Sequence, residues 1–249
     1  MANTRYIAKW NGVAWSALST ELNSWVQTLA FDAKKILYVG GLFTNAAYPY
    51  LCKWDGTSFS AVGTNADINN FVYFITEAPD GKIYVGGLFT NAGGVANADY
   101  IACWNGSQWE ALGTGVNNAV YTIRIYNEKV YVGGYFDKAG GITLTDRFAI
   151  WSNGAWQPVD INFPGNAVIN DILLASDGSL YIGGGFSTTS SSENAKTGIV
   201  ALNLNVSSAS ANTYPFISIM GPGTLKAITN YTTGKSVMLM GSRFKRVNG

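Results

Sequence analysis

Few side chains in this sequence are suited to acid–base, nucleophilic or metal chemistry. Histidine is absent from all 249 residues, which excludes Ser-His-Asp and Cys-His nucleophilic sites and histidine-bound zinc or copper. The two cysteines, Cys52 and Cys103, are too few for a thiolate metal site, and no Asp-x-Asp-x-Asp-Gly calcium loop occurs. We therefore expect neither a bound metal nor a cofactor.

Paired carboxylates are the remaining catalytic option, because glycoside hydrolysis needs two of them about 5–10 Å apart. Asp171 is the acid in the middle of an expected strand, whereas Asp32 and Glu77 fall at strand ends. The other acids considered are scattered over expected loops: Asp67, Asp99, Asp137, Asp146 and Asp160. We expect a protein that is not an enzyme, with a hydrolase using Asp171 or a loop acid as the less favoured alternative.

Neutral hydrogen-bonding side chains are more plentiful, since Asn, Thr, Ser and Tyr crowd one set of expected loops. Their amides and hydroxyls can bond sugar hydroxyls, and tyrosine rings can pack on sugar faces. The candidate ligand-binding residues are Asn45, Tyr48, Tyr50, Asn65, Asn69, Asn91, Asn97, Tyr100, Asn117 and Asn118. An alternative with equal weight is that these residues are ordinary turn formers.

The elements that must position these loops follow from an internal repeat. Tyr38-Val39-Gly40-Gly41-Leu42-Phe43 returns in four further copies, whose first glycines are Gly86, Gly133, Gly183 and Gly241. Successive copies lie between 46 and 58 residues apart. A period of this length, filled with β-branched and aromatic residues, indicates a repeat architecture such as a β-propeller.

One repeat reads most clearly from Ala119 to Val159. Residues 120–126, 129–136, 148–151 and 155–159 are expected strands, and Asn127-Glu128 is an expected tight turn. Four short antiparallel strands joined by turns make one propeller blade.

The hairpin between the last two strands of a repeat has the strongest local signal. It begins Trp-Asn-Gly or Trp-Asp-Gly at Trp10, Trp54 and Trp104, and Asn153-Gly154 serves the next copy. Asn-Gly and Asp-Gly predict two-residue type I′ turns. Aromatic residues five positions apart should then be diagonal neighbours on one face: Trp10 and Trp15, Trp54 and Phe59, Trp104 and Trp109, Trp151 and Trp156. We expect these rings to be core between adjacent blades, with a sugar-stacking ladder as the alternative.

The paired glycines do not predict a phosphate-binding loop. Gly40-Gly41 follows a strand, but neither a helical pattern nor a Lys-Ser or Lys-Thr pair comes after it. Glycine inside a strand permits a bulge or the close approach of a neighbouring backbone. Recurrence in every repeat therefore predicts a packing role.

The two ends of the chain complete each other. The chain stops after a second strand, while Ile7-Ala8-Lys9-Trp10 aligns with the third strand Leu51-Cys52-Lys53-Trp54. Residues 4–18 would then supply two outer strands and remove open sheet edges. The sequence predicts an all-β, five-bladed propeller with four antiparallel strands per blade, one domain over residues 1–249. Its blades fall at 25–62, 71–112, 119–159, 168–213, and 224–249 plus 4–18.

The pattern Ile-Ala-x-Trp-Asn-Gly-x-x-Trp-x-x-Leu-Gly followed by Tyr-Val-Gly-Gly-x-Phe resembles the distantly kelch-like propeller repeats of bacterial surface proteins and phage proteins. The resemblance covers nearly the whole chain and implies the fold but no single activity, since propellers include lectins, enzymes and scaffolds. In blade number and length the chain is also similar to the tachylectin family of sugar-binding propellers, from which no site residues carry over.

Bulk composition limits the partners. Charged residues are 12% of the chain and the net charge is +1. The one basic cluster, Arg243, Lys245 and Arg246, is too small to predict nucleic-acid binding. No apolar run approaches about 18 residues, so no membrane insertion is expected, and the N-terminus lacks a secretory signal pattern. Cys52 and Cys103 lie on equivalent strands of different blades, which predicts two buried free thiols.

These observations together predict a non-catalytic binding or assembly propeller. The expected partners are glycans or protein subunits of a larger assembly, contacted through one loop-rich face. The loops expected on that face are residues 19–24, 44–50, 63–70, 90–100, 113–118, 137–147, 160–166 and 187–197. The expected location is a virion, as a phage tail or capsid accessory protein, or an extracellular or cell surface. A soluble lectin is the alternative.

Overall fold

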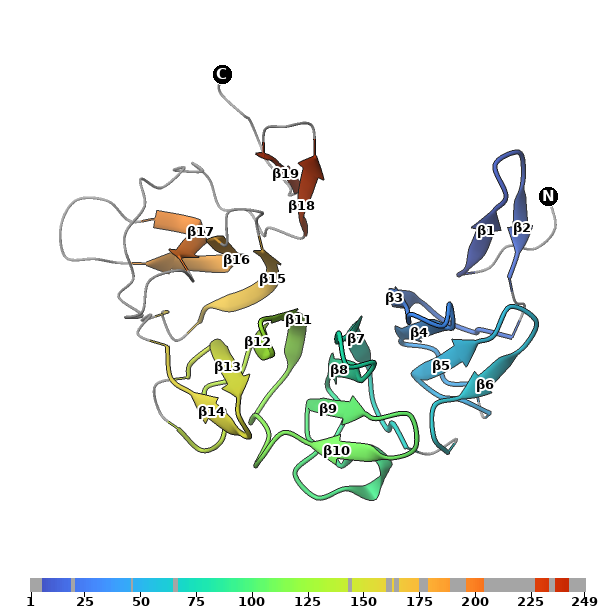
Figure 1. Cartoon of the computed structure of the whole chain (residues 1–249), viewed down its shortest axis with the longest axis horizontal. Coiled ribbons are helices and arrows are strands. Elements are labelled where there is room, and N and C mark those ends of the chain that lie inside the picture. The colour runs from blue at the N-terminus through green and yellow to red at the C-terminus, as the bar shows by residue number, and fades with distance from the viewer. Residues whose placement is uncertain are drawn as a thin grey trace. The chain divides into compact units, whose positions relative to one another are not determined.

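The computed structural model confirms the prediction of an all-β protein (Figure 1). It describes residues 6–18, 21–45, 47–64, 67–142, 145–159, 163, 166–174, 179–188, 196–203, 227–232 and 236–241. Within these residues the one helical element is a short 3₁₀ turn, η1 (Ala92–Gly94), and no helix is long and apolar enough to cross a membrane. The chain divides into two compact units, Met1–Gly115 and Val116–Gly249.

The first unit contains two four-stranded antiparallel sheets and one two-stranded sheet. The four-stranded sheets are β3 (Val26–Phe31), β4 (Leu37–Gly41), β5 (Leu51–Trp54) and β6 (Phe59–Ala61), then β7 (Val72–Glu77), β8 (Ile83–Gly87), β9 (Ile101–Trp104) and β10 (Trp109–Ala111). The two-stranded sheet is β1 (Ala8–Trp10) with β2 (Trp15–Ala17). Strands within each sheet pair in chain order, as a propeller blade requires.

The second unit repeats this pattern. Its sheets are β11 (Val120–Tyr126), β12 (Lys129–Gly134), β13 (Phe148–Ser152) and β14 (Ala155–Gln157); β15 (Val168–Leu174), β16 (Ser179–Thr188) and β17 (Lys196–Asn203); and β18 (Ala227–Thr232) with β19 (Ser236–Gly241). The fourth strand expected before residue 213 lies outside the described residues. No described sheet is closed, and β1–β2 and β18–β19 form separate sheets, so five blades and ring closure stay predictions.

Three outer hairpins differ from the predicted two-residue turns. Four residues separate the paired positions Trp10 and Trp15, Trp54 and Phe59, and Trp104 and Trp109. A side chain folds over each loop: Asn105 Oδ1 accepts the backbone N–H groups of Ser107 and Gln108, both at 3.0 Å. The equivalent side chains at positions 11 and 55 do the same. The Asn153-Gly154 turn has the predicted type I′ signature, with φ of 53° and 76°.

The aromatic pairs of these hairpins lie directly opposite one another rather than diagonally, because the loops are longer than predicted. The ring centroids of Trp104 and Trp109 are 5.4 Å apart. The predicted core role is confirmed for Trp104, Trp109 and Trp156, which are buried. It is wrong for Trp10 and Trp15 within the described residues, since these are 49% and 62% exposed.

The paired glycines have the predicted packing role. The second glycine of each pair lies beside an irregular step in the register of the first strand, where a Cβ on Gly87 would overlap the carbonyl oxygen of Phe71. The same overlap occurs in the other repeats, at Gly41, Gly134 and Gly184. The first glycine faces the next sheet, because a Cβ on Gly40 would lie 2.5 Å from Val72 Cγ1.

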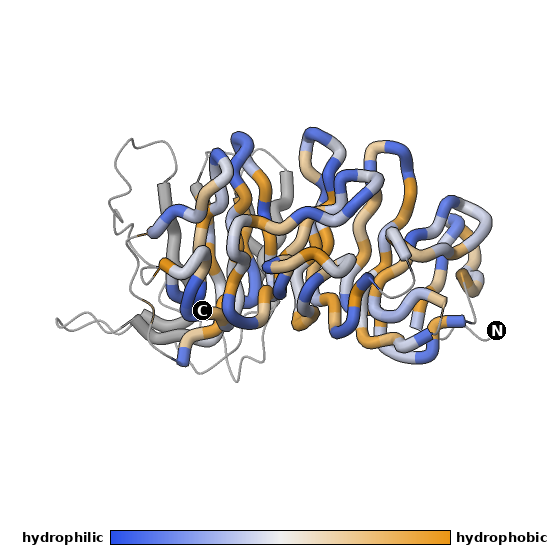
Figure 2. The backbone as a smooth tube through the Cα atoms, turned by 90° about the horizontal axis from the view of Figure 1, so that it is seen from below, coloured by the Kyte–Doolittle hydropathy of each residue, from blue (hydrophilic) through white to orange (hydrophobic). Residues whose placement is uncertain are grey.

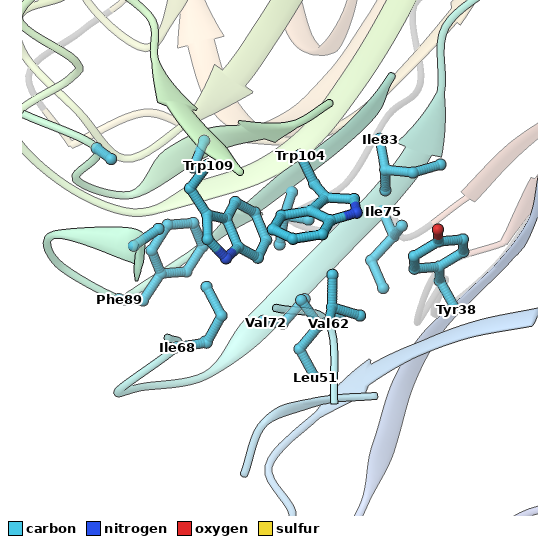
Figure 3. Packing of buried hydrophobic residues seen from close by; sticks show 14 residues of the cluster. Tyr38, Leu51, Val62, Ile68, Val72, Ile75, Ile83, Phe89, Trp104 and Trp109 are labelled. Atoms are coloured by element: carbon cyan, nitrogen blue, oxygen red, sulfur yellow. The ribbon is translucent and has the colours of Figure 1, made fainter. Parts of the chain in front are cut away.

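An apolar core fills the space between the two four-stranded sheets of the first unit. Figure 3 shows Trp104 and Trp109 of the second sheet with Val72 and Leu51 below them, and Figure 2 shows apolar residues recurring along the strands. Both cysteines are buried free thiols, as predicted. Burial raises the pKa of the Cys52 thiol to about 12.

Candidate functional site

The loop before the third strand of a sheet has a strained turn with a large side chain at its centre. Tyr50, Tyr100 and Arg147 have φ of 64°, 62° and 65°. The residue after each centre donates its backbone N–H to the carbonyl before the centre, at 2.7–2.8 Å. A turn with this bond and a positive central φ is the rarer, strained form of the γ-turn. Tyr6, at the equivalent position before β1, has φ of 65°.

Backbone pairing between neighbouring strands holds these centres in place. The Tyr100 N–H donates to the Phe89 carbonyl at 2.8 Å, and the Tyr100 carbonyl accepts the Gly87 N–H at 2.9 Å. Tyr50 and Arg147 make the same two bonds in their own sheets. Both backbone groups are therefore satisfied, and glycine would adopt this φ with least strain. The repeat nevertheless has Tyr, Tyr and Arg here, at a cost of about 1–3 kcal/mol each.

The side chains at these centres join larger planar groups. In the first unit the Tyr50 ring lies 5.9 Å from Phe71, whose ring lies 6.5 Å from Tyr73. In the second unit the Arg147 guanidinium lies 4.4 Å from the centroid of the Tyr135 ring, which is 40% exposed. Arg147 Nη1 also bonds the exposed Asp137 carboxylate at 2.9 Å. Arg147 itself is buried, so the exposed ring of the second unit is Tyr135, whereas the rings of Tyr50, Phe71 and Tyr73 in the first unit are half-buried.

Two of the predicted asparagines have a structural role instead. Asn69 Oδ1 accepts the Thr90 backbone N–H at 2.9 Å, and its Nδ2 donates to Thr90 Oγ1 at 3.2 Å. Asn117 Oδ1 accepts the N–H groups of Asp137 and Lys138. Asn23, which was not predicted, makes the equivalent bonds to Thr44. These residues tie the loop entering a sheet to the loop after its second strand.

The other predicted asparagines and Tyr48 also serve the loops. Asn45 accepts the Ala47 N–H and donates to the Glu21 carbonyl. Tyr48 is buried and its hydroxyl bonds Glu21. Asn118 accepts the Ala119 N–H at 2.8 Å. Asn91 and Asn97 occupy positive-φ positions, at 49° and 66°, and Asn65 lies outside the described residues.

Among the ten candidates, Tyr50 and Tyr100 are those at strained centres. Sequence reasoning missed Phe71, Tyr73 and Arg147. The signal that could have found Arg147 is its place in the repeat, directly before the third strand, where Tyr50 and Tyr100 also stand.

Asp171, the acid considered for catalysis, is held in an ion pair. It is buried on β15, and its Oδ1 lies 3.0 Å from Arg124 Nη2, 3.3 Å from Thr122 Oγ1 and 2.9 Å from the Ile172 N–H. Burial lowers the pKa of Arg124, an effect that the Asp171 charge opposes. The Asp171 carboxylate thus bonds two side chains of β11 and one backbone N–H of its own strand.

Comparisons with known proteins support the fold. A family model described as a domain of unknown function (DUF5122) beta-propeller matches residues 78–103. A crystal structure of the extracellular domain of BT4673 from B. thetaiotaomicron is similar over 94% of this chain, with 15% identity and a TM-score of 0.57. A second crystal structure of that domain gives 17% identity over 90%, with a TM-score of 0.55. No curated protein matches the sequence.

This chain spans 29% and 26% of the lengths of those two structures. The likeness is one of fold, because identity is low. The described sheets and the family match together identify an all-β, propeller-type arrangement of four-stranded antiparallel sheets.

Proposed function

We propose that the chain is a non-catalytic binding propeller that contacts its partner through the loop-rich side. The partner is a glycan or a protein subunit of a larger assembly, on a virion or at an extracellular or cell surface. A soluble lectin is the second form of the same proposal. Glycoside hydrolysis is the less favoured alternative, and turnover lost on Asp171→Asn would support it.

The strained centres are the observation that carries this proposal. A large side chain in a positive-φ turn is retained against a backbone cost that glycine would remove. Backbone strain at equivalent positions in several sheets supports a role for these side chains in contacting a partner. Tyrosine rings suit sugar faces and protein contacts alike, and the buried Arg147 contributes by packing against the exposed Tyr135 ring.

Tyr100→Gly tests the proposal, because it removes the ring and relieves the backbone together. We expect unfolding free energy to be unchanged or higher by up to about 1 kcal/mol. Binding on a glycan array, or to the purified particle that contains the protein, should fall. Lys35→Gly is the matched control, since Lys35 also has positive φ, 65°, but lies in the β3–β4 turn.

The result against the proposal is a destabilised Tyr100→Gly that binds as the unmodified protein does. Tyr100 would then be retained for packing. Loss of a particle contact without any glycan binding would favour the assembly form over the lectin form.

We also propose that the chain forms one domain, a five-bladed ring whose last blade combines β18–β19 with β1–β2. The register of β18–β19 supports this, because Ala227 pairs with Gly241 as Thr28 pairs with Gly40 and Thr122 with Gly133. Gly40 and Gly133 are each the first glycine of a Gly-Gly pair, and Gly241 is the corresponding glycine of the fifth copy. Tyr6 adds support from the other end, since its φ matches that of the residues preceding third strands.

Exposed apolar residues on β3 are a second line of support for closure. Ile75, Ile123 and Ile172 occupy one repeat position in β7, β11 and β15, and each is at most 3% exposed. Leu29 occupies that position in β3 and is 53% exposed. A blade placed before β3 would cover it, as β3 and β4 cover β7.

A further inference from the structure

A pocket opens between the outer strands of the two four-stranded sheets of the first unit. Its volume is about 640 Å³, within the range of about 300–1,000 Å³ usual for ligand sites. Polar groups from Lys53, Thr64, Asp67 and Gln108 line it, together with the edges of two indoles. Lys53 belongs to β5, whereas Gln108 lies in the β9–β10 loop. Five of its lining residues, Gly63, Thr64, Asp67, Gly93 and Val95, belong to loops of the loop-rich side, so this assignment rests on the proposed function, although no strained centre lines the pocket.

Part of the pocket wall is backbone, at Gly93 in the loop between β8 and β9. In the preceding sheet, the Tyr48 ring of the β4–β5 loop stacks on Phe59 of β6, with centroids 6.1 Å apart. In the corresponding loop of the next sheet, Gly93 meets Trp109, and a Cβ on Gly93 would overlap the indole Cδ1. The Gly93 backbone therefore packs directly against the Trp109 indole, and both residues line the pocket.

The Asp67 carboxylate is fixed at the pocket wall by three donors. Its Oδ2 accepts the Thr64 N–H at 2.8 Å and the Trp109 Nε1–H at 3.0 Å, and the Thr64 hydroxyl donates to Oδ1. Gly63, with φ of 78°, makes room, since a Cβ there would overlap Asp67 Oδ2. The carboxylate is thus oriented before any ligand arrives, which lowers the entropic cost of binding.

The lining favours a neutral ligand with many hydroxyls. The Asp67 carboxylate and the Lys53 ammonium carry opposite charges, so neither an anion nor a cation is matched by the whole lining. Carboxylate, amide and ammonium groups supply both acceptors and donors for hydroxyls. Trp104 and Trp109, which are 6% and 4% exposed, add a small apolar surface for the C–H edges of a ring.

We propose that this pocket binds a neutral saccharide unit. Asp67 accepts hydrogen bonds from its hydroxyls, and Lys53 and Gln108 donate to them. The two indole edges contact its carbon skeleton.

The test uses saturation-transfer NMR and titration of the full chain with four probes: the methyl glycosides of glucose, galactose, mannose and N-acetylglucosamine. Arginine and inorganic phosphate are the charged probes. At least one glycoside should bind in the millimolar range, and Asp67→Asn should weaken it about tenfold or more. Val95→Trp should abolish binding by filling the pocket, without removing any of the three bonds to Asp67.

Asp80→Asn is the matched control, because it removes a carboxylate from the exposed β7–β8 turn of the same sheet. It should bind the glycosides like the unmodified protein. Thermal melts of each variant identify loss of folding. The proposal is wrong if no glycoside binds, if only a charged probe binds, or if folded Asp67→Asn and Val95→Trp bind undiminished.

Discussion

Replacing the second glycine of a pair should destabilise the protein, even though alanine usually suits a strand better. Gly87→Ala would place a Cβ against the Phe71 carbonyl oxygen, a backbone atom that cannot rotate away. That same carbonyl accepts the Leu88 N–H at 2.8 Å, so moving it also weakens a bond of the bulge. Overpacking costs about 1–3 kcal/mol and the lost hydrogen bond about 1 kcal/mol.

Alanine recovers about 0.5–1 kcal/mol through lower unfolded-state entropy, so the expected net loss for Gly87→Ala is about 1–3.5 kcal/mol. Urea denaturation followed by tryptophan fluorescence measures it. Gly81→Ala is the control: nothing lies within 4 Å of its Cβ, and φ of 83° alone should cost about 1–2 kcal/mol. A Gly87→Ala variant as stable as the unmodified protein, or more so, would refute the packing role of the glycine pair.

Further perturbations test the other contacts. Leu29→Ala should cost about 2–4 kcal/mol, the cost also expected for Ile75→Ala, if a blade covers β3, whereas an open β3 predicts less than about 1 kcal/mol in the same urea assay. Asn69→Ala should cost about 1 kcal/mol because it leaves a loop N–H without its acceptor, and Asn69→Asp, which keeps the acceptor, should cost less. Burial raises the pKa of Cys52 and Cys103 from 9.0 to about 12. The folded state favours the protonated thiols, so their stabilisation is complete below pH 9 and is lost as the pH rises toward 12; urea titrations across this range check the fall.

The repeat could be predicted from the sequence because its recurring residues determine the structure of their own strand and turn. Tyr-Val-Gly-Gly-x-Phe combines strand-forming residues with glycines that only a bulge or a close neighbour requires, and both were found. The turn at Asn127-Glu128 followed from its two-residue length, and both residues have positive φ, 47° and 60°.

The outer hairpins were predicted wrongly because two solutions share the same residues. Asn before Gly can form a type I′ turn, but its side chain can also accept the next N–H groups and close a longer loop. Asn105 takes the second solution and Asn153 the first. The residues that follow Asn105 and Asn153 differ, and amino-acid composition alone does not show which of the two turns is more stable.

The candidate site could be predicted only in part, and the reason differs from that for the outer hairpins. Asparagine suits both ligand binding and loop bracing, and the bonds of Asn69 and Asn117 depend on loops about twenty residues away. The strained turns at Tyr50 and Tyr100 depend on pairing across strands, which the sequence does not reveal. The pocket at Asp67 depends on the packing of two sheets.

Ring closure is the claim on which the five-bladed account depends, and one cross-link tests it directly. By repeat register, Met240 should pair with Ala8 as Val39 pairs with Cys52. Paired strand residues have Cα atoms about 4.5–5.5 Å apart, which a disulfide can bridge. The Ala8→Cys/Met240→Cys variant should form an intramolecular disulfide, visible by mass spectrometry and by faster mobility on a non-reducing gel. The Lys9→Cys/Met240→Cys control, shifted by one residue and facing the other side of the sheet, should not. No disulfide, an equal yield in both variants, or a disulfide-linked dimer alone would contradict closure within one chain.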